Sequence, residues 1–435
     1  MIWAERLRLE KLCNLTDKNE YQIVDHLFRH QYGKMVAILS KIFGLSNLEL
    51  IEDAVQDTFL RAALKWRNEL PENPEAWLTQ AAKNRAVDLL RQINAEKGRR
   101  EKVFHGAITL QINEYFLDHE VADSQLRMIF VACHPSFTNE EQIAFALKAI
   151  SGFSMKEIAA ALLQKEETIK KRLVRARKKI QDLNIALTYP APNEIQERMS
   201  GVLQIIYLIF NEGFHSTKPG ALISKDLCGE AIRLCKLLLI KENFRSGSLY
   251  ALFALQCFHA SRLESKLGSD GIIDLKQQDR SQWYIPLIIL GNDALNKSME
   301  YNDRSIYHIE AAIASEHVKA AKFDQTDWAQ ILKLYEEMYL LMPSDHILLS
   351  MASIYLQTNA FAEAKLALDR IDSDSMNQRR YLFHGCRAEY YEKTGDAINA
   401  LQEIDLAIEL CSNKHEQQYL RTKRKKIAGK DISNK

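Results

Sequence analysis

The sequence predicts an all-α protein made of three successive helical domains. Only 16 glycines and 8 prolines occur among 435 residues. Strict alternation of apolar and polar residues is rare, and nearly every segment repeats its apolar residues at the 3.6-residue period of a helix. Hydrophobic residues make up 47% of the chain, enough for several cores. The length exceeds what one compact helical domain usually holds, so the core is expected to be divided.

The first domain is expected over residues 1–93, with three helices over about 21–42, 47–66 and 74–93. Ser46 followed by Glu49 predicts a capping box for the second helix. Asn73 followed by Pro74 predicts the start of the third helix. The polar and partly basic stretch 94–123 interrupts the helical period, and we interpret it as a linker.

The second domain is expected over 124–184 and has the pattern of a helix-turn-helix. Capping boxes at Thr138–Glu141 and Ser154–Glu157 predict two helices, and a third follows over about 167–180. One face of that third helix is apolar, and the remaining positions are basic: Lys170, Lys171, Arg172, Arg175, Arg177, Lys178 and Lys179. Such a helix suits DNA binding. A solvated charged face is the alternative, and the scarcity of nearby acids argues against it.

The third domain is expected over 190–435, after a boundary at Tyr189–Pro192 where two prolines stop a helix. It contains an internal repeat, because Ala352, Tyr355, Thr358 and Ala364 recur as Ala388, Tyr391, Thr394 and Ala400, each 36 residues later (388 − 352). The order of small and aromatic residues is typical of a tetratricopeptide unit, whose period is about 34 residues. An ordinary helical bundle is the alternative.

Three segments together resemble a known family. DAVQDTFLRAALKW at 53–66, PEAWLTQAAKNRAVDLLR at 74–91 and the basic helix-turn-helix resemble bacterial sigma factors of the sigma-70 family, in the extracytoplasmic-function (ECF) group. LRMIFVACHPSFTNEEQIAFAL and IIYLIFNEGF resemble a subgroup with a C-terminal tetratricopeptide-like extension. The resemblance implies sigma region 2 over 1–93, sigma region 4 over 124–184 and a tetratricopeptide-like extension over 190–435, for which we hypothesise a regulatory role because it is larger than the whole sigma part. The turn at 164–167 departs from the family because it lacks a glycine.

The resemblance also implies the function. A sigma factor binds core RNA polymerase, through its β′ clamp and β flap, and directs promoter-specific initiation without catalysis of its own. Three polar residues of the second helix share one face and would dock on the clamp: Asp53, Gln56 and Asp57.

The resemblance further implies two DNA-reading elements. The −10 element would be read and melted by region 2, through Lys83, Asn84, Arg85, Asp88 and Arg91. Asn84 would line the pocket for a flipped base, and the loop Leu70–Asn73 would form its rim. Trp77 falls on the apolar stripe and is expected in the core. The −35 element would be read by the helix-turn-helix, through Thr168, Lys170, Lys171 and Arg175, with phosphate contacts from Arg172, Arg177 and Lys178.

Several classes of function are disfavoured. The pairs Cys133–His134, Cys228–Cys235 and Cys257–His259 lack the paired CxxC spacing of a zinc site, and no P-loop, GxSxG or HExxH motif occurs. We therefore expect no metal, no cofactor and no enzyme. Seven scattered cysteines indicate reduced thiols in a cytoplasmic protein, and no apolar run is long enough for a membrane span.

Two questions about the C-terminal domain are open from the sequence. Gly213 is expected to cap a helix end, and the alternative is that the segment around it faces a ligand or partner. The extension is expected to bind a peptide or protein partner, or to dock on the sigma domains and control their exposure. The alternative for the whole chain is a helix-turn-helix regulator whose repeat domain senses a peptide. Such a regulator would not need the segments at 53–66 and 74–91.

Overall fold

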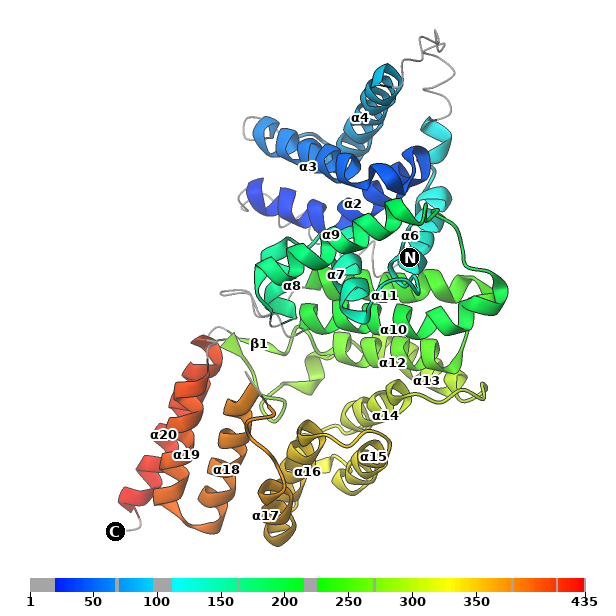
Figure 1. The fold of residues 1–435 in the computed structure, drawn as a ribbon. Helices are drawn as coiled ribbons and strands as arrows, with labels where there is room; N and C mark the ends of the chain where they lie inside the picture. Colours follow the sequence, from blue (N-terminus) through cyan, green and yellow to red (C-terminus); the bar gives the residue numbers. More distant parts are fainter. Residues whose placement is uncertain are drawn as a thin grey trace. The chain divides into compact units, whose positions relative to one another are not determined.

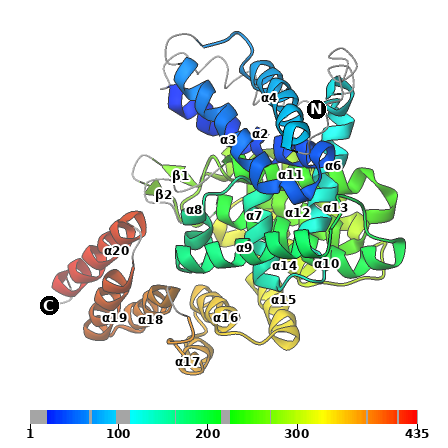
Figure 2. The same ribbon diagram turned by 45° about the horizontal axis from the view of Figure 1, so that its top comes forward.

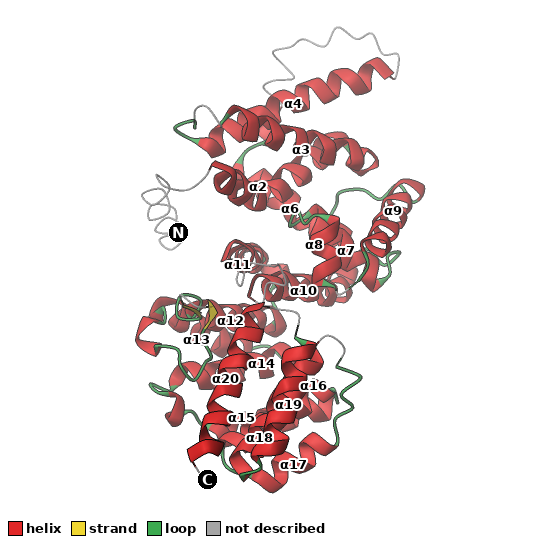
Figure 3. Cartoon of the chain, turned by 90° about the vertical axis from the view of Figure 1, so that its left-hand side faces the viewer, coloured by secondary structure: helices red, strands yellow, loops and turns green. Residues whose placement is uncertain are grey.

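The computed structural model describes residues 20–66, 70–96, 112–162, 164–214, 225–268, 271–376, 379–411 and 414–433. These residues are helical apart from loops and one short hairpin, formed by β1 (Leu267–Gly268) and β2 (Gly271–Ile272) (Figure 3). The chain divides into two compact units. The first contains Met1–Gly213 and Lys225–Phe244, and the second contains Phe214–Ser224 and Arg245–Lys435. The predicted all-α fold class is confirmed.

The first unit begins with three helices of the predicted kind, with a 3-10 turn before the second. They are α2 (Glu20–Phe43), η2 (Leu45–Asn47), α3 (Leu48–Lys65) and α4 (Pro74–Glu96). The predicted cap of α4 is confirmed, because Asn73 Oδ1 accepts a hydrogen bond from the Ala76 amide at 3.0 Å. The predicted cap at Ser46 is wrong. Ser46 lies inside η2, and the N-cap residue of α3 is Asn47. The side-chain amide of Asn47 donates through Nδ2 to the Phe43 carbonyl at 2.6 Å.

Four further helices carry the helix-turn-helix. They are α6 (Asp118–Ala132), α7 (Asn139–Ala149), α8 (Met155–Ala161) and α9 (Glu166–Asp182), shown in cyan and green in Figure 1. Both predicted capping boxes form, at Thr138–Glu141 and at Ser154–Glu157. The expected linker is shorter than 94–123, since α4 reaches Glu96 and α6 starts at Asp118, while residues 97–111 lie outside the described residues.

Two more helices, α10 (Pro192–Phe214) and α11 (Lys225–Ile240), follow, with η3 at Glu242–Phe244. Nearly all residues of these elements belong to the first compact unit, although the sequence suggested a new domain from residue 190. One contact that joins them to it is the hydrogen bond from Arg233 Nη2 to Gln125 Oε1 at 2.8 Å.

Gly213 does not cap a helix, because α10 continues through it to Phe214. A Cβ atom at this position would meet the Cys228 amide nitrogen and the Leu227 Cβ, each at 2.8 Å. Gly213 is therefore needed for the close approach of α11 to α10, and the predicted role in capping is wrong.

The helices of the second unit follow one another in chain order. They are α12 (Gly247–Ser261), η4 (Arg280–Gln282), α13 (Ile285–Ser298), α14 (Ile306–Lys319), η5 (Phe323–Gln325), α15 (Trp328–Leu341), α16 (Asp345–Gln357), α17 (Phe361–Asp369), α18 (Arg380–Thr394), α19 (Ala397–Leu410) and α20 (Lys414–Ser433). Helix α12 is buried on nearly all sides and packs against α13 and α14. The later helices, α16 to α20, pack largely on their chain neighbours (Figure 1).

The predicted repeat matches two equivalent helix pairs, α16–α17 and α18–α19. The four repeated alanines are completely buried: Ala352, Ala364, Ala388 and Ala400. Thr358 and Thr394 donate to the carbonyl groups four residues earlier, at the ends of α16 and α18. The next residues, Asn359 and Gly395, both have positive φ, of 58° and 86°. Each pair therefore turns in the same way, as a structural repeat requires.

The six cysteines in the described part of the chain are free and buried. No described helix is both long enough and apolar enough to cross a membrane.

Candidate functional site

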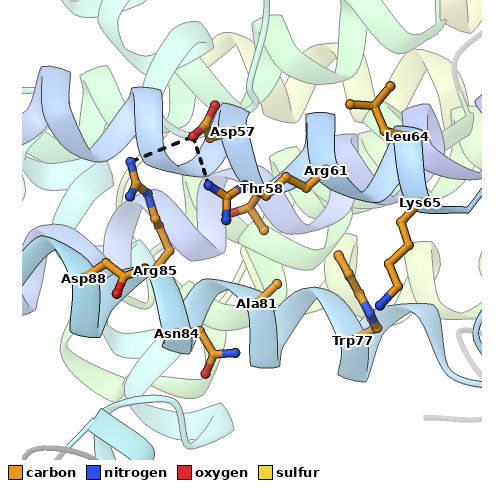
Figure 4. A pocket seen from close by; sticks show the side chains of 10 residues that line it. All are labelled: Asp57, Thr58, Arg61, Leu64, Lys65, Trp77, Ala81, Asn84, Arg85 and Asp88. Atoms are coloured by element: carbon orange, nitrogen blue, oxygen red, sulfur yellow. Dashed lines mark ion pairs between the residues drawn. The ribbon is translucent and has the colours of Figure 1, made fainter.

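Side chains of α3 and α4 line a groove (Figure 4). The two helices contact each other in the first unit, where both are labelled in Figure 2. The groove has a cavity volume of about 500 Å³. Its lining comes from both helices and is formed by Asp57, Thr58, Arg61, Leu64, Lys65, Trp77, Ala81, Asn84, Arg85 and Asp88. Asp57, predicted to bind polymerase, thus shares one groove with Asn84, Arg85 and Asp88, predicted to bind the −10 element.

Charges inside the groove are paired across it. Asp57 Oδ2 lies 3.8 Å from an Nη2 atom of both Arg61 and Arg85, one on each helix. Asn84 is exposed, and its Oδ1 accepts a hydrogen bond from Gln80 Nε2 at 3.1 Å. This bond orients the Asn84 amide so that its NH₂ group is left for another acceptor. The groove therefore presents a fixed amide next to partly neutralised arginines.

Trp77 lies in the groove and not in the core, so its prediction as a core residue is wrong. It is half-buried and lines the groove, while its ring packs edge-on against the buried Trp66 at 5.5 Å between centroids. Lys65 Nζ lies 5.6 Å from the Trp77 ring centroid. The residues of the loop 70–73, predicted as the rim, are absent from the described lining of the groove.

The remaining predicted −10 residues lie along α4. Lys83 is half-buried, and its Nζ lies 5.7 Å from the centroid of the Phe116 ring. Asp88 is exposed and lines the groove. The side chain of Arg91 lies outside the described residues.

The outer face of α3 combines polar and apolar side chains. Asp53 and Gln56 are exposed, and Asp57 is half-exposed, as one shared face requires. Leu60 and Leu64 extend this face and are 57% and 53% exposed. The sequence interpretation missed both leucines. Their spacing from Gln56, at i+4 and i+8, was the signal that could have identified them.

Helix α9 separates its apolar and basic faces as predicted. Ile169, Leu173, Ala176 and Ile180 are buried. The outward positions carry exposed basic side chains with no ion pair among the described residues: Lys170, Lys171, Arg175 and Lys178. Thr168 and Arg172 are half-buried beside them. Val174, 53% exposed within this basic face, was not predicted and offers an apolar contact of the kind that a thymine methyl accepts.

Two basic residues of α9 point inward. Arg177 Nη2 donates to Glu52 Oε2 of α3. Lys179 Nζ lies 2.6 Å from Glu141 Oε2 of α7 and also donates to the Ser136 carbonyl. Arg177, predicted as a phosphate contact, is therefore held by a carboxylate of its own chain in this conformation.

The Glu52 carboxylate is almost completely buried, at 4% exposure. Burial raises its pKa, and the nearby charges of Arg177 and Lys148 counteract that rise. Burial also lowers the pKa of Lys148. Because a buried carboxylate needs a counter-charge, the Arg177–Glu52 pair links α9 firmly to α3.

Close backbone packing supports the same contact. Gly33 of α2 lies so near the end of α7 that an added Cβ would meet the Ile150 carbonyl oxygen at 1.8 Å. Gly152, at φ +68°, packs against the ring of Tyr32, which an added Cβ would meet at 2.9 Å.

Within the described residues, no group of three potential metal ligands occurs.

Comparison with known proteins finds matches to three family models. The model of Sigma-70 region 2 matches residues 27–96, and that of Sigma-70, region 4 matches residues 127–180. A family of unknown function, DUF6596, matches residues 198–299. Uncharacterized protein R00370 of Rhizobium meliloti (strain 1021) is 32% identical over 380 residues, which cover 86% of this chain and 89% of that protein. No solved structure matches.

Proposed function

This chain belongs to the sigma-70 family, as an ECF-type factor with a C-terminal helical extension, and we propose that it docks on core RNA polymerase through α3. As a sigma factor it acts in promoter recognition, with core RNA polymerase and promoter DNA as partners. The exposed face of α3 supports the docking proposal. Leu60 and Leu64 supply apolar area, and Asp53 and Gln56 supply charge and hydrogen bonds for a basic partner surface such as the clamp.

We propose that the groove between α3 and α4 binds the opened −10 strand. The observation that carries this proposal is the exposed, hydrogen-bonded amide of Asn84 in a groove with a half-buried Trp77. An amide can pair with a base edge, and an indole can stack on a base. Lys65, Arg61 and Arg85 would attract the backbone of the strand.

We propose that α9 enters the major groove at the −35 element. Its support is the outward basic face, in which Lys170, Lys171, Arg175 and Lys178 surround Val174. The position of α9 after the short α8 and a four-residue connection is that of a recognition helix. Arg177 would reach phosphate only after leaving Glu52.

The division into region 2 (1–93), linker (94–123), region 4 (124–184) and regulatory extension (190–435) is likewise proposed. One structural contact bears on how to test the regulatory part. Cutting the chain at residue 190 would remove α11 and leave Gln125 without its partner Arg233. The suitable truncation therefore ends at Phe244, where the first compact unit ends. We expect run-off transcription by this truncated chain to differ from that of the full-length chain if the extension controls activity, and equal activity would contradict that control.

The decisive experiment is binding of the full-length chain to core RNA polymerase, followed by run-off transcription. We expect Leu60→Ala combined with Asp53→Asn to weaken polymerase binding at least tenfold. Asp293→Asn, on an exposed position of α13, serves as the control and should leave binding unchanged. A chain that binds promoter DNA but not core polymerase would contradict the docking proposal and would favour the alternative of a helix-turn-helix regulator.

A further inference from the structure

The start of the second unit contains a cluster of cationic side chains outside the sigma regions. Arg262 ends α12, Lys266 follows it, and Arg280 lies in η4. His259 and His317, on α12 and α14, lie beside these cations. Most of the cluster falls in the 198–299 segment that matches the family of unknown function.

Two of these cations have a clear structural role. Lys266 is buried, and its Nζ donates to the Phe214 carbonyl at the end of α10 at 2.8 Å. Arg280 donates through Nη1 to the carbonyl groups of His317 and Ala320, at 2.8 and 2.6 Å. Both therefore satisfy helix C-terminal carbonyls, where positive charge is favourable.

Arg262 has no comparable partner. Its guanidinium contacts the Nδ1 atom of His259 at 3.1 Å and lies 5.3 Å from the Phe214 ring centroid. Neither Arg262 nor Arg280 forms an ion pair with a carboxylate in the described part of the chain. The acid next to Arg280 in sequence, Asp279, instead accepts hydrogen bonds from Ser281 at the start of η4.

No carboxylate of the described residues compensates the charges of Arg262 and Arg280. Burial and the charge of Arg280 lower the pKa of Arg262 to about 10. Burial and the two arginines lower the pKa of His317 to about 4. Two buried nitrogen atoms beside these arginines lack a hydrogen-bond partner among the described residues, namely His317 Nδ1 and Trp283 Nε1. The Trp283 ring lies 5.0 Å from the Arg280 guanidinium.

Buried charges in proteins are normally paired, so a cation cluster without an acid indicates that an anion is supplied from outside. We propose that Arg262, with Arg280 and His317 beside it, forms a binding site for a small oxyanion, that is, a phosphate group or a carboxylate. Arg262 is half-buried, and its guanidinium is a fork of N–H donors, which suits two oxygen atoms of one anion. The site gives the extension a small-molecule ligand in addition to any protein partner.

The rival explanation is that Arg262 only stabilises the C-terminal end of α12. The two explanations predict different melting temperatures for an Arg262 variant when no ligand is present. If Arg262 caps the helix, Arg262→Gln lowers the melting temperature of the full-length chain. If Arg262 instead forms an anion-binding site, Arg262→Gln leaves the melting temperature of the ligand-free chain unchanged or raises it, because an uncompensated charge is removed.

The test uses calorimetric titration and thermal melting of the full-length chain with inorganic phosphate or with succinate, at constant ionic strength set with sodium chloride. We expect at least one of the two anions to bind and to raise the melting temperature. Arg262→Gln should weaken that binding about tenfold or more, and Arg421→Gln, on an exposed position of α20, should not. Preference for phosphate or for succinate identifies the ligand class. Absence of binding by both, or equal binding by wild type and Arg262→Gln, would overturn the proposal.

Discussion

The two helices of the first unit that we propose to read DNA, α4 and α9, differ in how their charges are arranged. The groove beside α4 pairs its arginines internally, since Asp57 faces both Arg61 and Arg85. The outer face of α9 leaves its cations without ion pairs among the described residues, for example at Lys171 and Arg175. Unpaired surface cations attract phosphate and make binding salt-dependent, whereas a groove with partly neutralised arginines and an exposed amide favours recognition of a particular base.

The difference teaches that one chain can divide affinity and selectivity between two surfaces. On this view α9 supplies most of the salt-dependent attraction to DNA, and the groove beside α4 supplies selection of the opened strand. The four predictions below test this division, starting from the largest expected effect.

Two arginines two residues apart on α9 should behave in opposite ways. Arg177→Met leaves the buried Glu52 carboxylate without its partner and should lower the free energy of unfolding of the first unit by about 3 kcal/mol. Arg175→Met, on the exposed face, should change it by less than about 0.5 kcal/mol. Denaturant unfolding of the full-length variants measures both. The double variant Arg177→Met with Glu52→Gln should regain most of the loss, and equal effects of the two single variants would show that the Arg177–Glu52 pair is not buried as described.

Arg175 and Lys178 should separate base contact from phosphate contact on α9. Arg175→Ala should weaken binding to promoter DNA by about 1–3 kcal/mol while leaving binding to random DNA less affected. Lys178→Ala should weaken both equally and reduce the slope of log K against log salt by roughly 0.9. Titrations at several salt concentrations with both DNAs give the answer. A uniform loss for Arg175→Ala would reassign it as a phosphate contact.

Asn84 should affect selection of the opened strand without changing salt dependence. Asn84→Ala is expected to weaken binding to DNA with a single-stranded −10 segment by about 1–2 kcal/mol, because a base loses its amide partner. Gln80→Ala should act in the same direction but more weakly, since Gln80 only orients that amide. Binding is measured on bubble and fully duplex templates. An equal loss on both templates would contradict a role in reading the opened strand.

Asp57 should have only a small effect on stability. Its ion pairs are partly exposed and 3.8 Å long, so Asp57→Asn should change the free energy of unfolding by less than about 1 kcal/mol. The same change frees Arg61 and Arg85, so binding of single-stranded DNA should become stronger and more salt-dependent. Filter binding at two salt concentrations tests this. Unchanged salt dependence would show that Asp57 does not neutralise the groove.

Local signals in the sequence predicted much of the fold. The capping boxes at Thr138 and Ser154 and the Asn73–Pro74 start depend only on residues within one turn, and all three form. The prediction of Ser46 as the N-cap of α3 was wrong because a 3-10 turn precedes α3 and shifts the N-cap to Asn47. A serine three residues before a glutamate cannot reveal that shift.

Contacts between distant segments were not predictable from the sequence. Trp77 satisfies the apolar stripe of α4, yet the space beside it is a groove whose other wall is α3. In the sequence, Arg177 does not differ from the other basic residues of α9, because its partner Glu52 lies 125 positions away. Gly213 is of the residue type that often caps a helix, but α11 approaches too closely for any side chain at this position. In each case the deciding partner lies on another helix.

The contact of α9 with α3 has a consequence for equilibrium populations. Arg177 cannot contact a DNA phosphate while it donates to Glu52, so its proposed phosphate contact requires a conformer in which this pair is broken. The DNA-competent form is then a separate conformer, and the apparent dissociation constant for a promoter equals the intrinsic one divided by the fraction of molecules in that form. Promoter occupancy would thus depend on a pre-equilibrium within the protein as well as on the DNA sequence.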